Sequence, residues 1–324
     1  MDLVKDSQTG REYRLVTDDS TPSRKLYFSQ DSFVADDSAV VYHRYADNEP
    51  ELRAVDVRTG DDRLLVSAAD ARCGSFGMAW TGDRGYLQRG NELWELELST
   101  GRTTAVARLP EAATTLGHFT VSGSGSVVNA MQLQSKIYAL VVIDPSSGSV
   151  EIPLRTDVRL GHSQISPTDE NLIFHVHETG GDALQRMWMY DRRDGVRRPF
   201  FVEQEGDWIT HETWHPSGEY LTFIKWPYAI MKGWADGQRF EVIAEGEYLH
   251  AAPDRSGGLI AADRTRTGEI LLVDAATGRE TVLVTGHSAT VGPDHCHPSF
   301  NRAGDRIVFS APGGGVCRIG VVDV

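Results

Sequence analysis

Residues Asp274 to Val284 read D-A-A-T-G-R-E-T-V-L-V, a tight turn around a glycine followed by a β-branched strand. The same pattern begins at Asp56 as D-V-R-T-G-D-D-R-L-L-V and at Asp6 as D-S-Q-T-G-R-E-Y-R-L-V. Looser copies begin at Glu97 and Asp144. Glycine suits such a turn because it adopts positive φ without a steric penalty. The recurrence predicts one β-hairpin used repeatedly along the chain.

A second hairpin recurs beside the first, with a polar three-residue turn between two short apolar strands. Seven such turns begin at Asp36, Gly82, Ser122, Pro167, Pro216, Arg255 and Arg302. Their spacing of roughly 40 to 50 residues is typical of four-stranded propeller blades. The pattern therefore predicts an all-β fold, a seven-bladed β-propeller that forms a single domain over residues 1–324.

The two ends of the chain predict how the propeller closes. The last repeat stops at Val324, before the turn and fourth strand that complete the other repeats. The copy that begins at Asp6 has the sequence of that missing turn and strand. An N-terminal strand that completes the last blade leaves no open sheet edge there.

Composition limits the classes of partner and the compartment. The 324 residues carry a formal net charge of -14, which disfavours nucleic acid and anionic membranes as partners. No apolar run is long enough to cross a bilayer, and the N-terminus lacks a basic region followed by an apolar one. Three widely spaced cysteines, Cys73, Cys296 and Cys317, argue against a disulfide framework. We therefore expect a cytoplasmic protein.

Four histidines share one position in the repeat, seven residues before the turn marker. They are His162, His211, His250 and His297, in a chain with 11 histidines among 324 residues. The position starts the first strand of each blade, so we expect these rings to converge at one mouth of the propeller channel. If the stretch D-H-C-H-P-S-F runs as a strand, His295 projects on the same side as His297, and Cys296 on the other.

Two interpretations of the converging histidines remain open at this point. Each ring can bind a neighbouring backbone group and simply hold two blades together. Alternatively, clustered neutral imidazoles suit a divalent ion such as Zn, Mn, Fe or Ni.

Several stretches resemble the oligogalacturonate lyases, seven-bladed propeller enzymes of pectin degradation. They are Y-F-S-Q-D-S-F at Tyr27, G-H-S-Q-I-S-P-T-D-E-N-L-I at Gly161, Q-R-M-W at Gln185, T-H-E-T-W-H-P-S-G at Thr210 and D-H-C-H-P-S-F at Asp294. The resemblance implies a lyase that cleaves an anionic oligouronide by β-elimination with the help of Mn²⁺. It places the metal on His250, His295 and His297, the catalytic base on His211, and the substrate carboxylate on Arg186.

Two further points qualify these assignments. His162 is a candidate for substrate binding because it shares the repeat position of the other histidines. In the family a glutamine ligand stands three residues before the first histidine of H-x-H, and here that position is Gly292. We expect the ion to lose one protein ligand as a result. A non-catalytic propeller that senses or scaffolds through a metal or ligand at its channel mouth is the alternative function.

Overall fold

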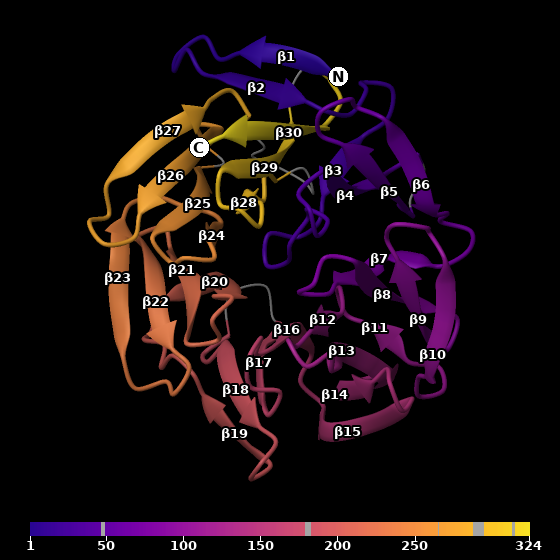
Figure 1. The fold of residues 1–324 in the computed structure, drawn as a ribbon. Helices are drawn as coiled ribbons and strands as arrows, with labels where there is room; N and C mark the ends of the chain where they lie inside the picture. Colours follow the sequence, from indigo (N-terminus) through magenta and orange to yellow (C-terminus); the bar gives the residue numbers. More distant parts are fainter. Residues whose placement is uncertain (47–48, 179–182, 265, 288–294, 313–314) are drawn as a thin grey trace. The chain divides into compact units, whose positions relative to one another are not determined.

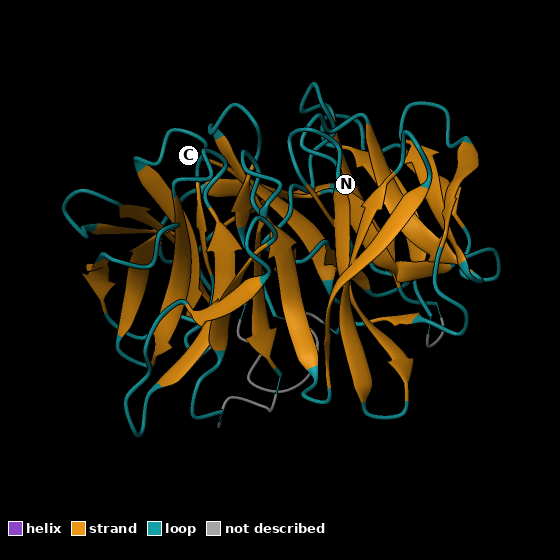
Figure 2. Cartoon of the chain, turned by 90° about the horizontal axis from the view of Figure 1, so that it is seen from below, coloured by secondary structure: helices purple, strands orange, loops and turns teal. Residues whose placement is uncertain are grey.

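The computed structural model describes residues 1–46, 49–178, 183–264, 266–287, 295–312 and 315–324. Within these ranges the chain forms strands and loops and no helix, as Figures 1 and 2 show. The strands build seven antiparallel sheets. Six are assembled from strands that follow one another along the chain, and the seventh joins the last three strands to the first two. The predicted all-β, seven-bladed β-propeller fold is thereby confirmed. No helix among the described residues has the length and hydrophobicity required to span a membrane.

The chain divides into two compact units. The first comprises residues 1–67, 210–215 and 219–324, and the second comprises 68–209 and 216–218. The single domain over residues 1–324 stays a prediction.

The first unit contains four blades. One blade consists of β3 (Ser23–Lys25), β4 (Ala39–Arg44), β5 (Glu51–Asp56) and β6 (Asp62–Val66), and the next one in this unit consists of β20 (Trp208–Trp214), β21 (Tyr220–Trp226), β22 (Ala229–Trp234) and β23 (Phe240–Glu245); Trp208 and Ile209 of β20 belong to the second unit. A third blade consists of β24 (Ala251–Pro253), β25 (Leu259–Arg264), β26 (Glu269–Asp274) and β27 (Glu280–Val284). The last blade combines β28 (Ser299–Phe300), β29 (Arg306–Ala311) and β30 (Arg318–Asp323) with β2 (Glu12–Leu15) and β1 (Asp2–Lys5).

The second unit contains three blades. Their strands are β7 (Arg72–Met78), β8 (Arg84–Arg89), β9 (Glu92–Glu97) and β10 (Thr103–Arg108); β11 (Thr114–Thr115), β12 (Thr120–Val121), β13 (Val127–Gln134), β14 (Ile137–Asp144) and β15 (Ser149–Thr156); and β16 (Leu160–Ile165), β17 (Leu172–His177), β18 (Met187–Asp191) and β19 (Val196–Pro199).

The recurring turn explains why these strands form where they do. In the copy at Asp274, the carboxylate accepts the backbone N–H groups of Ala276 at 3.1 Å and Thr277 at 2.8 Å. Gly278 follows with a φ of 68°. The aspartate replaces a backbone partner, and glycine takes the left-handed conformation at no steric cost. The hairpin between β26 and β27 is therefore encoded locally.

The last blade is completed by the N-terminal segment, as the sequence predicts. Strand β2 pairs with β30 in an antiparallel register that sets Tyr13 opposite Val322. Strand β1 adds a fifth strand beyond β2. Asp6 fastens the segment to the preceding blade, because its carboxylate accepts the backbone N–H of Thr285 at 2.7 Å. The predicted closure is confirmed and gains one strand.

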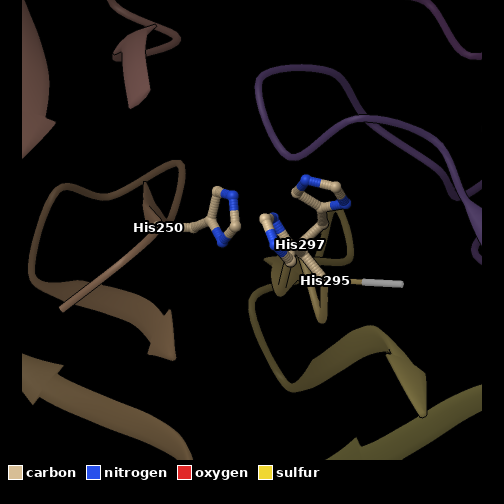
Figure 3. Close-up of side chains that lie close together, drawn as sticks. All are labelled: His250, His295 and His297. Carbon is tan, nitrogen blue, oxygen red and sulfur yellow. The ribbon is translucent and has the colours of Figure 1, made fainter. Parts of the chain in front are cut away.

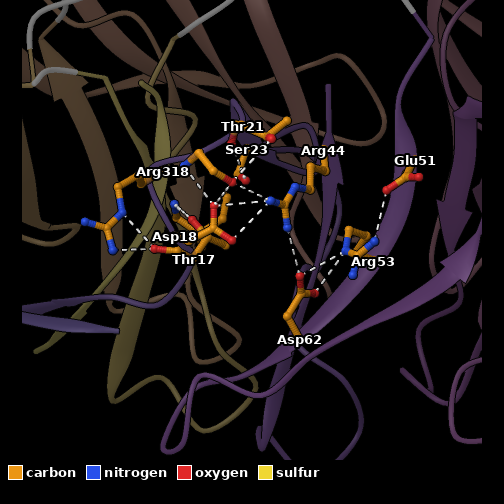
Figure 4. A network of polar contacts seen from close by, with 11 residues as sticks. Thr17, Asp18, Thr21, Ser23, Arg44, Glu51, Arg53, Asp62 and Arg318 are labelled. Atoms are coloured by element: carbon orange, nitrogen blue, oxygen red, sulfur yellow. Dashed lines mark hydrogen bonds and ion pairs between the residues drawn. The ribbon is translucent and has the colours of Figure 1, made fainter. Parts of the chain in front are cut away.

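Ion pairs reinforce the same region of the first unit (Figure 4). Arg44 contacts Asp18 at 3.1 Å and Asp62 at 3.2 Å, and Asp62 also accepts Arg53 Nε at 3.0 Å. Arg318 of β30 donates from Nε to the carbonyl oxygen of Thr17 at 2.7 Å. These contacts tie the segment after β2 to both the first and the last blade.

Apolar side chains of adjacent blades pack into shared clusters. One cluster joins the blade of β20–β23 to that of β24–β27; it includes Ile224, Ile230, Tyr248, Ile260, Leu271 and Val273, all nearly or fully buried. Burial of each such side chain contributes about 1.5–3 kcal/mol. This packing fixes the first strands of neighbouring blades beside each other, and those strands position the histidines.

Candidate functional site

The three predicted metal ligands lie together in the first unit (Figure 3). His250 immediately precedes β24, and His295 and His297 precede β28. One ring nitrogen from each of the three lies within 4.8 Å of the others. Three imidazole nitrogens at that spacing form the donor set that divalent transition metals take from proteins.

His211 of β20 borders this trio. Its ring centroid lies 4.1 Å from that of His250, while the centroids of His250 and His297 are 4.3 Å apart. Three neighbouring blades of the first unit thus bring four of the five predicted histidines together. The fifth, His162, belongs to the second unit.

The backbone at these positions departs from regular strand geometry. His211 and His297 have φ values of 54° and 49°, and His162 has a φ of 45°. Left-handed backbone is uncommon for residues other than glycine and concentrates at functional sites. Between β16 and β17 the pairing register shifts from Gly161 to Gln164, which forms a bulge around His162. Bulges of this kind re-aim a side chain away from the sheet.

This geometry corrects the expectation that the H-x-H stretch is a strand. Strand β28 begins only at Ser299, so His295 and His297 lie in the preceding loop. The two rings lie with their centroids 5.8 Å apart in a loop where His297 has a left-handed backbone, so strand alternation does not explain their approach. Cys296 does turn away, as predicted, since its buried Sγ lies 3.3 Å from the carbonyl oxygen of His287. Cys73, Cys296 and Cys317 are all free and buried.

A buried carboxylate supports the cluster from β25. Asp263 lies 3.0 Å from Nδ1 of His250 through Oδ2 and accepts the backbone N–H of His250 at 2.8 Å through Oδ1. Both side chains are fully buried. Burial raises the pKa of Asp263 to about 7, while hydrogen bonds and nearby imidazoles act in the opposite direction.

Burial also lowers the pKa of His297 well below its usual range, and the cationic forms of His250 and Lys25 add to the effect. The ring is therefore neutral at physiological pH, which is the form that binds metal. Lys25 itself is buried, with a pKa lowered to about 7 by desolvation. Its Nζ donates to the carbonyl oxygen of Leu26 at 2.7 Å.

Two aromatic rings wall the cluster. Tyr27 lies with its centroid 4.9 Å from that of His297, and Phe28 lies 5.1 Å from that of His250. Both belong to the Y-F-S-Q-D-S-F stretch, so that motif places apolar surface beside the imidazoles.

The two predicted substrate-binding residues lie together in the second unit. Arg186 is 3% exposed, and its Nη1 lies 3.5 Å from Oε1 of Glu178. The other oxygen of Glu178 lies 3.5 Å from Nε2 of His162. Gly161 leaves room for this carboxylate, because a Cβ there would lie 2.8 Å from Glu178 Oε2. Glu178 thus bridges the arginine and the histidine.

Sequence reasoning missed three charged residues around these groups: Asp263, Lys25 and Glu178. Each lies on or next to the first or second strand of its blade. The sequence pattern of these strands does not distinguish a charged residue that supports a site from one that faces solvent. Gly292, the position where the chain departs from the family pattern, lies outside the described residues.

No protein-family model matches the chain. Over 243 residues it is 21% identical to the oligogalacturonate lyase of Dickeya dadantii and 20% identical to the oligogalacturonide lyase of Pectobacterium atrosepticum. Each match covers 68% of this chain and 63% of the relative, so it spans less than two thirds of either relative's length.

Two solved structures share the fold over the whole chain. The crystal structure of oligogalacturonate lyase from Vibrio parahaemolyticus superposes with a TM-score of 0.87 at 18% identity. A structure described as oligogalacturonate lyase in complex with manganese gives 0.89, also at 18% identity. Each covers 100% of this chain and 96% of the solved chain. The predicted resemblance to this family is confirmed.

Proposed function

We propose that this chain, which resembles the oligogalacturonate lyases in sequence and in fold, is a metal-dependent lyase that cleaves oligogalacturonate or a related oligouronide by β-elimination. One observation carries the proposal: His211 adjoins three histidines whose ring nitrogens lie within 4.8 Å of one another. A basic group next to a candidate metal site is the pairing that removal of a weakly acidic carbon-bound proton requires.

The residues present fit a divalent transition-metal ion on His250, His295 and His297, and we choose Mn²⁺ because a solved oligogalacturonate lyase of the same fold is described in complex with manganese. All three donors are imidazoles, and the low pKa of His297 supplies it in the neutral form that coordinates. A bound ion would neutralise the carboxylate of the sugar and thereby acidify the neighbouring C5–H group.

His211 would take the proton from C5. The electron pair of the C5–H bond then forms the C4–C5 double bond, and the C4–O bond breaks with its pair on the leaving oxygen. That oxygen gains a proton, and no water is consumed. The products are a 4,5-unsaturated uronide and a shorter saccharide with a new reducing end.

Arg186 would bind the substrate carboxylate, and His162 would bind the substrate beside it. A guanidinium presents two parallel N–H donors to a carboxylate, which fixes its orientation as well as its charge. In a chain with a net charge of -14, such cationic groups are needed to attract an anionic oligosaccharide. A cytoplasmic location, and the lack of a nucleic-acid or membrane partner, belong to the same proposal.

The base assignment is tested by comparing two histidines of one blade. His211→Ala should lower kcat by about 100- to 10,000-fold, the usual contribution of a general base, and keep the affinity for Mn²⁺. His215, whose ring stacks on Tyr220 at 4.5 Å, is the control. His215→Ala removes an imidazole from the same strand region and should leave kcat near the wild-type value. Normal turnover in His211→Ala would show that another group takes the proton.

A further inference from the structure

Asp263 supports one of the three proposed metal ligands, His250, through two different groups. Its carboxylate accepts the backbone N–H of His250 at 2.8 Å and lies 3.0 and 3.1 Å from Nδ1 of the same residue. Both Asp263 and the His250 ring are fully buried. We infer that Asp263 is the positioning residue of the metal centre, because it sets the tautomer and the orientation of His250.

The tautomer follows from the hydrogen bonds. The carboxylate of Asp263 accepts the backbone N–H of His250 and, as an acceptor without a proton of its own to give, also accepts Nδ1–H of the same residue. The proton then sits on Nδ1, and Nε2 carries the lone pair available to a metal. A carboxylate behind a metal-bound imidazole orients the ring and increases its basicity.

The same support orders the site before an ion binds. His250 precedes β24, and its ring centroid lies 4.3 Å from that of His297, which precedes β28 in the next blade. A His250 ring that Asp263 already holds in place loses less entropy when the ion binds, which raises affinity.

The variant Asp263→Asn distinguishes a positioning role of the carboxylate from a role in packing alone. Asp263→Asn keeps the size of the side chain but replaces one acceptor oxygen with an N–H₂ donor. Nδ1–H of His250 then keeps at most one acceptor atom, where the carboxylate offers two at 3.0 and 3.1 Å. Because outer contacts of this kind typically change metal affinity 10- to 100-fold, we expect Asp263→Asn to bind Mn²⁺ about 10- to 100-fold more weakly.

Asp254 provides a matched control in the same blade. It is also buried, and its carboxylate accepts the backbone N–H of Leu259 at 2.9 Å and of Ser256 at 3.2 Å in the turn before β25. Asp254→Asn should lower the melting temperature and keep the wild-type affinity for Mn²⁺.

Calorimetric titration of metal-free protein with MnCl₂ decides the matter. The inference rests on the proposed metal site, so the wild type is measured first. If the wild type binds no Mn²⁺, the proposed function fails. If the wild type binds and Asp263→Asn binds equally well, only the positioning role is overturned.

A second measurement uses the wild-type protein alone, so it does not require that Asp263→Asn folds. Nitrogen-15 NMR of the metal-free wild-type protein reports which nitrogen of His250 carries the proton. We expect protonated Nδ1 and unprotonated Nε2. A ring protonated on Nε2 alone would overturn the inference even if Asp263→Asn does not fold.

Discussion

Two residues of the last blade share a left-handed backbone for different reasons. Gly304, in the turn between β28 and β29, has a φ of 77°, and His297, seven residues earlier, has a φ of 49°. Glycine adopts this conformation without strain, whereas histidine does so at a cost of order 1–3 kcal/mol. The turn residue serves folding. Histidine occupies a position where glycine would fold with less strain. We therefore attribute the histidine to the contacts that its ring makes.

The same contrast separates other parts of the first unit. At Asp274–Gly278, the aspartate carboxylate accepts two backbone N–H groups of its own turn, and the left-handed conformation suits Gly278. Around Asp263, a buried carboxylate and several imidazoles are held in an arrangement that local sequence preferences do not favour. Regions that break local rules in this way are expected to be functional.

The largest expected effect comes from removing the strained ligand. His297→Ala should weaken Mn²⁺ binding by more than about 100-fold, because two imidazoles remain and the ring supported by Asp263 loses its neighbour. Cys296→Ala is the control, since Cys296 lies in the same loop with its thiol turned away. Titration calorimetry measures both. Equal affinity in His297→Ala and wild type would remove this residue from the metal site.

A smaller effect is expected in the second unit. Arg186→Lys should raise KM for an oligouronide by about 10-fold and change kcat less, because an ammonium cannot bind a carboxylate through two parallel donors. The exposed Arg193, which pairs with Asp191 at 2.8 Å, is the control, and Arg193→Lys should leave KM unchanged. Initial rates over a range of substrate concentrations give both constants. An unchanged KM in Arg186→Lys would place the substrate carboxylate elsewhere.

The smallest effect sharpens the comparison of the two left-handed residues. His297→Gly should be more stable than His297→Ala by about 1 kcal/mol, since glycine relieves the strain that alanine retains. Gly304→Ala should lower the free energy of unfolding by about 1 kcal/mol, because alanine is strained at a positive φ. A steric clash adds nothing to this loss, since a Cβ there meets no atom closer than 3.8 Å. Urea denaturation monitored by tryptophan fluorescence measures the free energy of unfolding. Equal stability of the two His297 variants would mean that the backbone there is not strained.

The sequence was sufficient to predict the features that repeat. Hairpins with Asp and Gly at fixed positions, the completion of the last blade by the segment at Asp6, and one histidine position shared by four blades all leave periodic traces. The repeat also predicted that His211, His250 and His297 lie together, whereas His295 was added on the assumption that H-x-H is a strand.

Features without a periodic trace could not be predicted. Asp263 occupies one ordinary position in one strand, and its importance arises only when folding brings His250 against it. Glu178 likewise matters because Gly161 leaves space for its carboxylate between Arg186 and His162. The left-handed turn at His297 was missed because histidine has no local preference for it.

One assay tests the central claim of metal-dependent elimination most directly. Chelator-treated wild-type protein is mixed with oligogalacturonate, and ultraviolet absorbance of the enoate product is followed before and after addition of MnCl₂. The account predicts no rise before the metal and a steady rise after it, with one new reducing end for each enoate formed. New reducing ends without enoate absorbance, or no product in the presence of Mn²⁺, would contradict it.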